Sequence, residues 1–423
     1  MRKGKRSKKR NETVTGSEQQ HGPGSHDILV RDKRGVDEKP TPQVEVEVGI
    51  ERLTLDDDNL DGSALLVSLL EDNTSSTDAS CSSASTSTIT SPQDTLLEVV
   101  STPDRGLAVF TTRKIKAGTL ILAERPLIAL SKTEETDPQS IERHFAALPR
   151  PEQKVYLSLF DAQKSRMSRV VSIYYSNCYN CEGEGSTRDG SAIGALSSRI
   201  NHSCVPNVQF SYHAGKGEMR FFALKDIPRG REVCGNYERD VCHRVAERQR
   251  RQRMYYGFAC ACEACVPRTE FWARSDERRR GMYDALGRVK GLEKRWAAEE
   301  RGQERREEEG VGQSENEYEK EKRKRKERAL IVIDALDALT RLEGLLIKEG
   351  LVGVPLANTY RRMAKWAERK GETATQDVVK WKTRELQVCI TCFGDDGQRA
   401  QDIKTRLGEL SRREKPYVMS HSC

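Results

Sequence analysis

Three cysteines near the middle of the chain constrain its fold more than any other sequence feature. Cys260, Cys262 and Cys265 form a C-x-C-x-x-C pattern. Three thiolates this close repel one another, and a bound Zn²⁺ ion relieves the repulsion. A structural zinc site has four protein ligands, so the fold has to supply one more from elsewhere. Cys204 is the best candidate. On spacing alone four other cysteines compete with it: Cys178, Cys181, Cys234 and Cys242.

The segment around Cys204, from Arg199 to Asn207, has the character of a site rather than of a connector. It is short and polar, and the residues on both sides are apolar and typical of strands. Asn201 and His202 offer directional hydrogen-bonding groups, and Pro206 prevents a helix from running through the segment.

Composition limits where a core can form. Only 36% of the 423 residues are hydrophobic and 32% are charged, so we expect the core in only part of the chain. The sequence has no secretory signal peptide and no apolar run long enough to span a membrane, and its twelve cysteines are irregularly spaced. These features predict an intracellular protein of the nucleus and/or cytoplasm, without a membrane segment, whose clustered cysteines bind metal rather than form disulfides.

Residues 1–94 lack a core pattern, and we expect a disordered tail. The chain begins with a basic run from Met1 to Arg10, and 13 of the 18 residues from Thr74 to Ser91 are Ser or Thr. Such a composition cannot bury enough apolar surface to offset the entropy of ordering. The basic run is interpreted as a nuclear-import signal or as an arm for an acidic partner, with a solubilising tail as the alternative.

From residue 95 onward the pattern predicts a small, irregular β-fold. Short apolar segments alternate with Gly-containing turns, and at about residues 133–172 the apolar spacing becomes helical, which we interpret as a helical insertion. Val208–Tyr212 and Met219–Leu224 flank a Gly-containing turn and predict a hairpin. Residues 95–267 are therefore expected to form one α+β domain.

The remainder of the chain is expected to be helical. Residues 268–328 carry many charges of both signs and predict a charged helical spacer, and residues 329–423 have apolar residues at helical spacing and predict a helical bundle. Cys389 and Cys392 lie on one predicted helix and are expected in its core. The basic runs contain no interleaved aromatic residues, so we expect no specific nucleic-acid binding.

Four motifs together resemble a known family. In chain order they are Arg105-Gly-Leu-Ala108, Asn201-His-Ser-Cys-Val-Pro-Asn207, Gly230-x-Glu-x-x-x-x-Tyr237 and Phe258-x-Cys-x-Cys-x-x-Cys265. Their order and approximate spacing are similar to those of SET-domain protein lysine methyltransferases, and the nearest branch resembles proteins related to the SET-and-MYND group. The resemblance is strong over residues 95–267 and weak over the helical tail.

The resemblance implies a cofactor, S-adenosylmethionine, and a structural zinc ion. It assigns to the cofactor Arg105, Gly106, Asn177, Asn201, His202, Tyr237 and Phe258. Phe258 is expected to pack on the adenine, and Tyr237 to lie at the point of methyl transfer as the catalytic residue. It assigns to zinc Cys204, Cys260, Cys262 and Cys265. The zinc-bound segment 258–267 would then be a flap after the SET domain, as in the family.

The activity that the resemblance implies is the transfer of a methyl group to a lysine side chain of a histone or another protein. Methyl transfer to an amine is an in-line displacement, so alignment supplies much of the rate. An apolar channel and a nearby sulfonium charge both depress the pKa of the substrate lysine, so a dedicated base is not required. Tyr237 is therefore interpreted as a positioning and electrostatic residue.

The sequence departs from the family pattern at several points. Cys234, Gly235 and Asn236 precede Tyr237 where the family usually carries β-branched or hydroxyl residues. No cysteine lies between Gly106 and Asn177, so the MYND zinc module is absent from the sequence. These departures keep an alternative open, a catalytically weak SET-like scaffold that mediates protein–protein interactions. The pair Cys178-x-x-Cys181 has metal-ligand spacing but lacks two further ligands.

Overall fold

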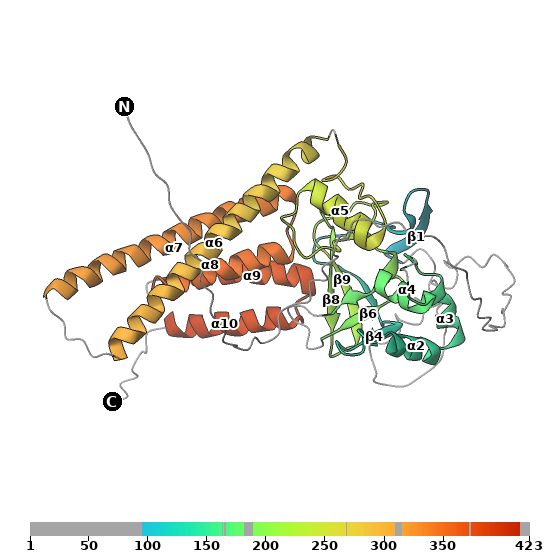
Figure 1. Ribbon diagram of the computed structural model, residues 1–423, viewed down its shortest axis with the longest axis horizontal. Helices are drawn as coiled ribbons and strands as arrows, with labels where there is room; N and C mark the ends of the chain where they lie inside the picture. The colour runs from blue at the N-terminus through green and yellow to red at the C-terminus, as the bar shows by residue number, and fades with distance from the viewer. Residues whose placement is uncertain are drawn as a thin grey trace, which may run out of the picture. The chain divides into compact units, whose positions relative to one another are not determined.

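The structure is a computed structural model that describes residues 95–414, apart from 163, 165, 182–188, 268, 309–314 and 372–373. All of these residues belong to one of the two compact units of the chain, Asn59–Cys423. The predictions made for residues 1–94 lie outside the described residues. Where the sequence predicts an irregular β-fold followed by helices, the structure has short strands and then long helices (Figure 1).

The strands form small sheets rather than one large sheet. β1 (Leu97–Thr102) pairs antiparallel with β2 (Gly106–Thr111), and Gly106 enters β2 at a φ of +67°, which favours glycine. One three-stranded sheet has the order β3-β9-β8 and another has the order β4-β6-β5. Their strands are β3 (Leu120–Glu124), β4 (Ile128–Leu130), β5 (Tyr179–Asn180), β6 (Ser191–Ile193), β8 (Val208–His213) and β9 (Glu218–Ala223). The β8–β9 hairpin confirms the hairpin that the sequence predicts.

A short parallel pair brings two distant motifs together. β7 (Asn201–His202) lies beside β10 (Cys234–Gly235), with Asn201 opposite Cys234 and His202 opposite Gly235. Asn207 fixes this pairing from one side, because its side-chain oxygen accepts from the Cys234 N–H at 2.8 Å. The segment that leads to Tyr237 therefore runs alongside the Asn-His motif.

Three helices lie between β4 and β6, in the region where the sequence changes to helical spacing. They are α2 (Pro138–Ala147), α3 (Arg150–Leu157) and α4 (Arg169–Asn177). Asp137 caps α2 by accepting from two backbone N–H groups, and a proline occupies its first turn. Ile141, Tyr156 and Ile173 pack with β4 and β6 in one buried cluster. The helices thus form a small core together with these two strands.

The C-terminal part of the chain is helical. Its helices are α5 (Val245–Tyr256), α6 (Glu270–Glu308), α7 (Glu315–Glu349), α8 (Val354–Glu368), α9 (Thr375–Phe393) and α10 (Gln398–Glu414). The long helices α6 and α7 run alongside each other (Figure 1), and Val289 of α6 and Leu339 of α7 belong to the same buried cluster. α7 continues without a break through residues 328 and 329, so the charged segment is a wall of the bundle as well as a link to it.

Two features connect the helical part to the strands. Cys389 and Cys392 of α9 are fully buried, which confirms that they are core residues, and they pack with Leu224 at the end of β9. Gly394, just after α9, lies so close to Phe222 that a Cβ there would be 3.0 Å from the ring.

Within the described stretches of the chain, no helix combines the length and apolar character needed to cross a membrane.

Candidate cofactor and metal site

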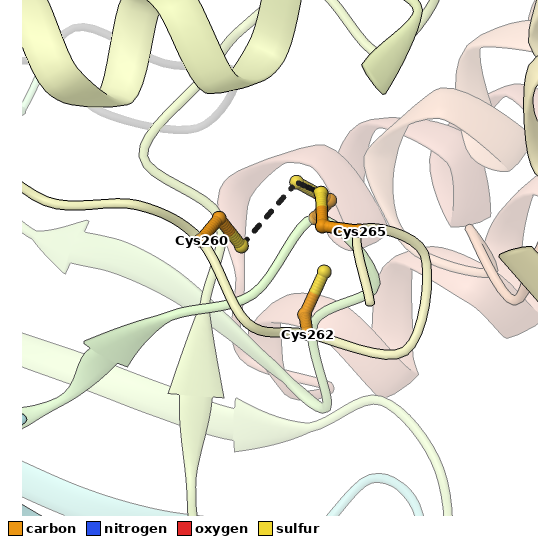
Figure 2. Close-up of side chains that lie close together, drawn as sticks. Cys260, Cys262 and Cys265 are labelled. Carbon is orange, nitrogen blue, oxygen red and sulfur yellow. Dashed lines mark hydrogen bonds between the residues drawn. The ribbon is translucent and has the colours of Figure 1, made fainter. Parts of the chain in front are cut away.

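Four cysteine sulfurs meet at one point of the fold. Cys204 comes from the loop after β7, and Cys260, Cys262 and Cys265 come from the loop after α5, where they point toward one another (Figure 2). All four sulfurs lie within 4.8 Å of one another. The Cys204 sulfur is 3.9 Å from that of Cys260 and 3.6 Å from that of Cys265. The fold therefore selects Cys204 from the competing cysteines.

The geometry and chemistry of this cluster are compatible with zinc. Four thiolates at about 2.3 Å from a tetrahedral zinc ion lie about 3.8 Å from one another, close to the two sulfur separations above. Hydrogen bonds among the four thiols lower the pKa of Cys262 and Cys265 and raise the pKa of Cys204 and Cys260. A metal binds thiolates, so zinc binding would release the protons that these thiols share. Arg248, buried in α5, donates to the Cys265 sulfur at 3.5 Å and to the Ala264 carbonyl at 2.7 Å. Its positive charge would offset part of the negative charge of four zinc-bound thiolates.

Beside the cysteines, three of the predicted cofactor residues form an aromatic cluster. The ring of His202 is 5.1 Å from that of Tyr237 and 6.0 Å from that of Phe258, between centroids. The rings of Tyr237 and Phe258 are 6.5 Å apart and nearly perpendicular. These residues are 56 positions apart at the extremes, from 202 to 258, and the β7–β10 pairing and the cysteine cluster bring them together.

Hydrogen bonds fix the tautomer of His202. Its Nδ1 lies 3.1 Å from the backbone nitrogen of Tyr237, which is a donor, so Nδ1 accepts. Its Nε2 therefore carries the proton and donates to the Cys204 sulfur at 3.3 Å. Burial lowers the pKa of His202 to about 4, so the ring is neutral at pH 7. One imidazole thus connects the cysteine cluster to the segment that holds Tyr237.

The Glu232 carboxylate joins two further predicted residues, Arg105 and Asn201. Glu232 accepts from the Arg105 guanidinium at 2.6 Å and from the Asn201 amide at 3.0 Å. Asn201 also lies 3.5 Å from the Leu107 carbonyl, one residue after Gly106. The turn at Arg105 and Gly106 is therefore held next to the Asn-His motif, as the resemblance implies for a cofactor site.

Asn177, the remaining predicted cofactor residue, stands at the C-terminal end of α4. Its amide donates to the carbonyls of Phe160 and Ile173, each at 2.7 Å. These bonds hold the 158–162 loop against α4. A direct contact between Asn177 and a cofactor stays a prediction.

Sequence reasoning missed two residues of this site. Tyr256 closes the aromatic cluster, with its ring 5.1 Å from that of Tyr237 and 6.3 Å from that of Phe258. In the sequence, the only sign of this role for Tyr256 is that it is an aromatic residue two positions before Phe258. Glu232 is part of the third motif but received no role, because nothing in the sequence shows that it meets Arg105 and Asn201.

A buried acid supports the loop that precedes the motif. Glu124 of β3 accepts from the backbone N–H groups of Leu196 at 3.0 Å and Ser197 at 2.7 Å. Burial raises the pKa of the Glu124 carboxyl above its ordinary value. Gly194 is the close neighbour that permits this contact, since a Cβ there would lie 2.3 Å from Glu124 Oε1.

Two hollows flank the site. A cleft of about 740 Å³ has Tyr237 and Gly235 on its wall, and it is bounded by β8 on one side and by Leu351 and the end of α9 at Phe393 on the other. A smaller, more polar cavity of about 390 Å³ is lined by Arg105, His202 and Glu232. The site therefore opens toward the junction of the strands and the C-terminal helices.

Comparison with known proteins identifies the class of domain. Residues 106–238 match the family model of the SET domain, from the Gly106 turn to the residue after Tyr237. The chain therefore contains a SET domain. Cys204 lies inside this domain and the other three cysteines follow it, and the four sulfurs together are compatible with a zinc ion.

Three relatives illustrate the similarity. The chain is 31% identical over 192 residues to the histone-lysine N-methyltransferase set5 of Schizosaccharomyces pombe, covering 45% of this chain and 57% of the relative. It is 31% identical over 113 residues to the protein-lysine N-trimethyltransferase SMYD5 of Mus musculus, covering 26% of this chain and 27% of the relative. It is 25% identical over 205 residues to the putative SET domain-containing protein L678 of Acanthamoeba polyphaga mimivirus, covering 41% of this chain and 79% of the relative. The similarity thus spans little more than half of the fission yeast relative.

Proposed function

We propose that the protein is an S-adenosylmethionine-dependent protein-lysine N-methyltransferase. The observation that supports this most directly is the meeting of His202, Tyr237 and Phe258 beside the cysteine cluster, inside a SET domain. Two relatives with similar sequences are named as histone-lysine and protein-lysine methyltransferases. The substrate of this chain is then a lysine side chain of a histone or another protein.

In this proposal the motif residues hold the cofactor. Phe258 offers a ring face for stacking, and Asn201 and His202 offer polar groups next to it. Arg105 and Gly106 bring the β1–β2 turn close, and Glu232 keeps that turn in register with the motif. When bound, S-adenosylmethionine supplies an electrophilic methyl group on a sulfonium. The chain itself then has to orient the acceptor amine and exclude water.

Tyr237 acts as a positioning group in this proposal, not as a base. Burial raises the pKa of Tyr237 above its ordinary value of 10.0, so its hydroxyl keeps its proton at neutral pH. The hydroxyl donates to the Ile200 carbonyl at 2.9 Å, which holds the ring against the residue before Asn201. Burial also raises the pKa of Tyr256 to about 12. Both phenols are therefore uncharged and provide no anion to stabilise an ammonium group, so burial beside them favours the neutral form of a lysine amine.

The cysteine cluster, in this proposal, binds a structural zinc ion. The ion would tie the loop after α5 to the loop after β7 and so keep Phe258 beside His202. The chain closes all four ligand positions with cysteine, which leaves no position for a reacting water. The chemistry is therefore assigned to the aromatic cluster.

The cleft beside Tyr237 is the proposed place for the substrate polypeptide. It is large enough for several side chains, and its wall combines apolar residues of β8 with residues of the C-terminal helices. A helical region that forms one side of this cleft would contribute to the choice of substrate. Nuclear or cytoplasmic proteins are the expected partners; the basic arm that suggests an acidic partner lies outside the described residues.

The alternative of a weakly active scaffold finds less support. It depends on a loosely held segment before Tyr237, from residue 234 to 236, but hydrogen bonds hold the start of this segment in place. The Cys234 N–H donates to the Asn207 side chain, and the Asn207 amide donates to the Glu232 carbonyl at 2.8 Å.

A methyl-transfer assay tests the proposal. The purified full-length protein is incubated with isotope-labelled S-adenosylmethionine and, in separate reactions, with core histones and with a protein extract from cells that lack it. Labelled methyl-lysine that disappears with the Tyr237→Phe variant supports the proposed function. Binding of S-adenosylhomocysteine without transfer to any protein would favour the scaffold, and no binding at all would refute the proposal.

A further inference from the structure

A buried ion pair lies where the long helices meet the motif loops. Arg279 of α6 has 1% of its side chain exposed, and Glu349, the last residue of α7, has none. The Arg279 Nε donates to Glu349 Oε1 at 2.9 Å, and the Ser275 hydroxyl donates to the same oxygen at 2.6 Å. Arg278 donates to the other oxygen of Glu349. Both oxygens of the carboxylate thus accept hydrogen bonds from residues of α6.

The rest of the Arg279 guanidinium reaches into the candidate site. Its Nη2 donates to the Cys204 carbonyl at 2.9 Å, and its Nη1 donates to the Val241 carbonyl at 2.5 Å. Cys204 lies two residues after His202, and Val241 lies four residues after Tyr237. One planar side chain therefore joins the loop that follows the Asn-His motif to the loop that follows Tyr237.

Close packing at the end of α7 supports the same connection. Gly350, directly after Glu349, adopts a φ of +75°, and a Cβ there would lie 2.9 Å from Cγ1 of Val205. Val205 is the residue after Cys204. The helix end and the motif loop thus touch at a second point, independent of the guanidinium.

We infer that Arg279 is a positioning residue that couples the C-terminal helical pair to the cofactor and metal site. Its guanidinium sets the separation between the Cys204 loop and the segment after Tyr237, and Glu349 fixes the guanidinium. A buried charge with this many fixed partners has little freedom to relax, so replacing it shifts both loops at once. The helical region is then needed for the geometry of the site and not only for stability. The cofactor part of this inference rests on the proposed function.

The neighbouring residue Arg278 provides a matched control. It donates to the same carboxylate, but its other contacts are the Phe271 carbonyl at 3.1 Å and the Phe271 ring. Arg278→Met therefore disturbs Glu349 without removing a bond to either site loop. A loss that follows Arg279 and not Arg278 reports the contacts to Cys204 and Val241.

Two measurements on the zinc-loaded, full-length protein test the inference. Calorimetry gives the dissociation constant for S-adenosylhomocysteine, and a chromogenic chelator gives the rate of zinc release. Arg279→Met is expected to weaken S-adenosylhomocysteine binding and to speed zinc release, each by about tenfold or more. Arg278→Met is expected to change both by less than about threefold, at a comparable loss of thermal stability.

Arg279→Lys guards against a variant that fails to fold. A lysine retains a charge for Glu349, but its single nitrogen cannot take the places of the three guanidinium nitrogens that bond Glu349, Val241 and Cys204. It should therefore fold and still show both defects. Equal effects of Arg279→Met and Arg278→Met, or wild-type behaviour of Arg279→Lys, would overturn the inference. If the wild-type protein does not bind S-adenosylhomocysteine, the proposed function fails. Zinc release by itself then decides the role of Arg279.

Discussion

The backbone N–H of Tyr237 donates to Nδ1 of His202 over 3.1 Å, and the opposite nitrogen of the ring lies 3.3 Å from the Cys204 sulfur. His202 is buried, and its lowered pKa keeps it neutral, so the ring has one donor and one acceptor and uses both. The cysteine cluster and the tyrosine segment therefore share a single imidazole. A change at one of them is expected to reach the other.

Replacing Tyr237 with phenylalanine removes the hydroxyl but keeps the ring. We expect the methyl-transfer rate to fall by at least about 100-fold, because a fixed dipole at the reacting groups is lost. Affinity for S-adenosylhomocysteine should change by less than about threefold, since the ring stays in the cluster. Tyr255→Phe, at a residue that is 47% exposed on α5, is the control and should leave the rate unchanged. Full activity of Tyr237→Phe would show that the assigned role is wrong.

Replacing Cys204 with serine removes the proposed zinc ligand that would link the two loops. We expect zinc and cofactor affinity to fall together, because the loop that carries Phe258 is then no longer tied to His202. Metal content by mass spectrometry and S-adenosylhomocysteine binding by calorimetry measure the two effects. Cys242→Ser changes a buried cysteine outside the cluster and should retain both. Retention of both zinc and cofactor affinity by Cys204→Ser would contradict the coupling.

Replacing Gly194 with alanine should destabilise the fold. The new Cβ would lie 2.3 Å from Glu124 Oε1 and 2.5 Å from the Ser197 hydroxyl. Both side chains are buried, and a shift of Glu124 would break its hydrogen bonds to the N–H groups of Leu196 and Ser197. We expect a loss of about 2 kcal/mol or more in the free energy of unfolding, measured with urea. Gly344→Ala, at an open position of α7, should instead leave the stability unchanged or raise it by up to about 1 kcal/mol. Equal stabilities of the two variants would contradict the packing around Glu124.

The carboxyl of Glu124 should make stability fall as pH rises. Burial raises its pKa in the folded protein above the ordinary value of 4.5. As pH rises past 4.5, the carboxyl loses its proton in the unfolded chain but keeps it in the folded protein. The free energy of unfolding therefore falls with pH until the folded-state pKa is also passed. Each unit of separation between the two pKa values is worth about 1.4 kcal/mol.

The measurement for Glu124 compares the wild type with Glu124→Gln in urea unfolding over a range of pH. The difference in the free energy of unfolding, wild type minus variant, should be greatest in acid and should decline as pH rises through this window. Taking this difference removes the contributions of the other titrating groups, which both proteins share. A difference that stays constant with pH, or that grows as pH rises, would be the opposite of the expected sign.

Local patterns in the sequence predicted much of the fold because they depend on neighbouring residues. The β8–β9 hairpin follows from apolar alternation around a glycine-containing turn, and the core positions of Cys389 and Cys392 follow from helical spacing. The charged segment is different. Its helices pack along the bundle through a few apolar positions such as Met282 and Val289, and mixed charge conceals such a sparse stripe.

The sequence by itself determined which residue types the candidate site can offer: a cysteine triplet, an Asn-His-Ser-Cys motif, and a tyrosine and a phenylalanine further along the chain. These types follow from short motifs, whereas the role of each residue stays a prediction. Only the tertiary structure decided which groups meet. It selected Cys204 over the competing cysteines, set the tautomer of His202, and placed Glu232 between Arg105 and Asn201. It also brought Arg279 from α6 to the motif loop. These contacts join residues far apart in the chain, and their partners are fixed by packing in three dimensions, which no local pattern records.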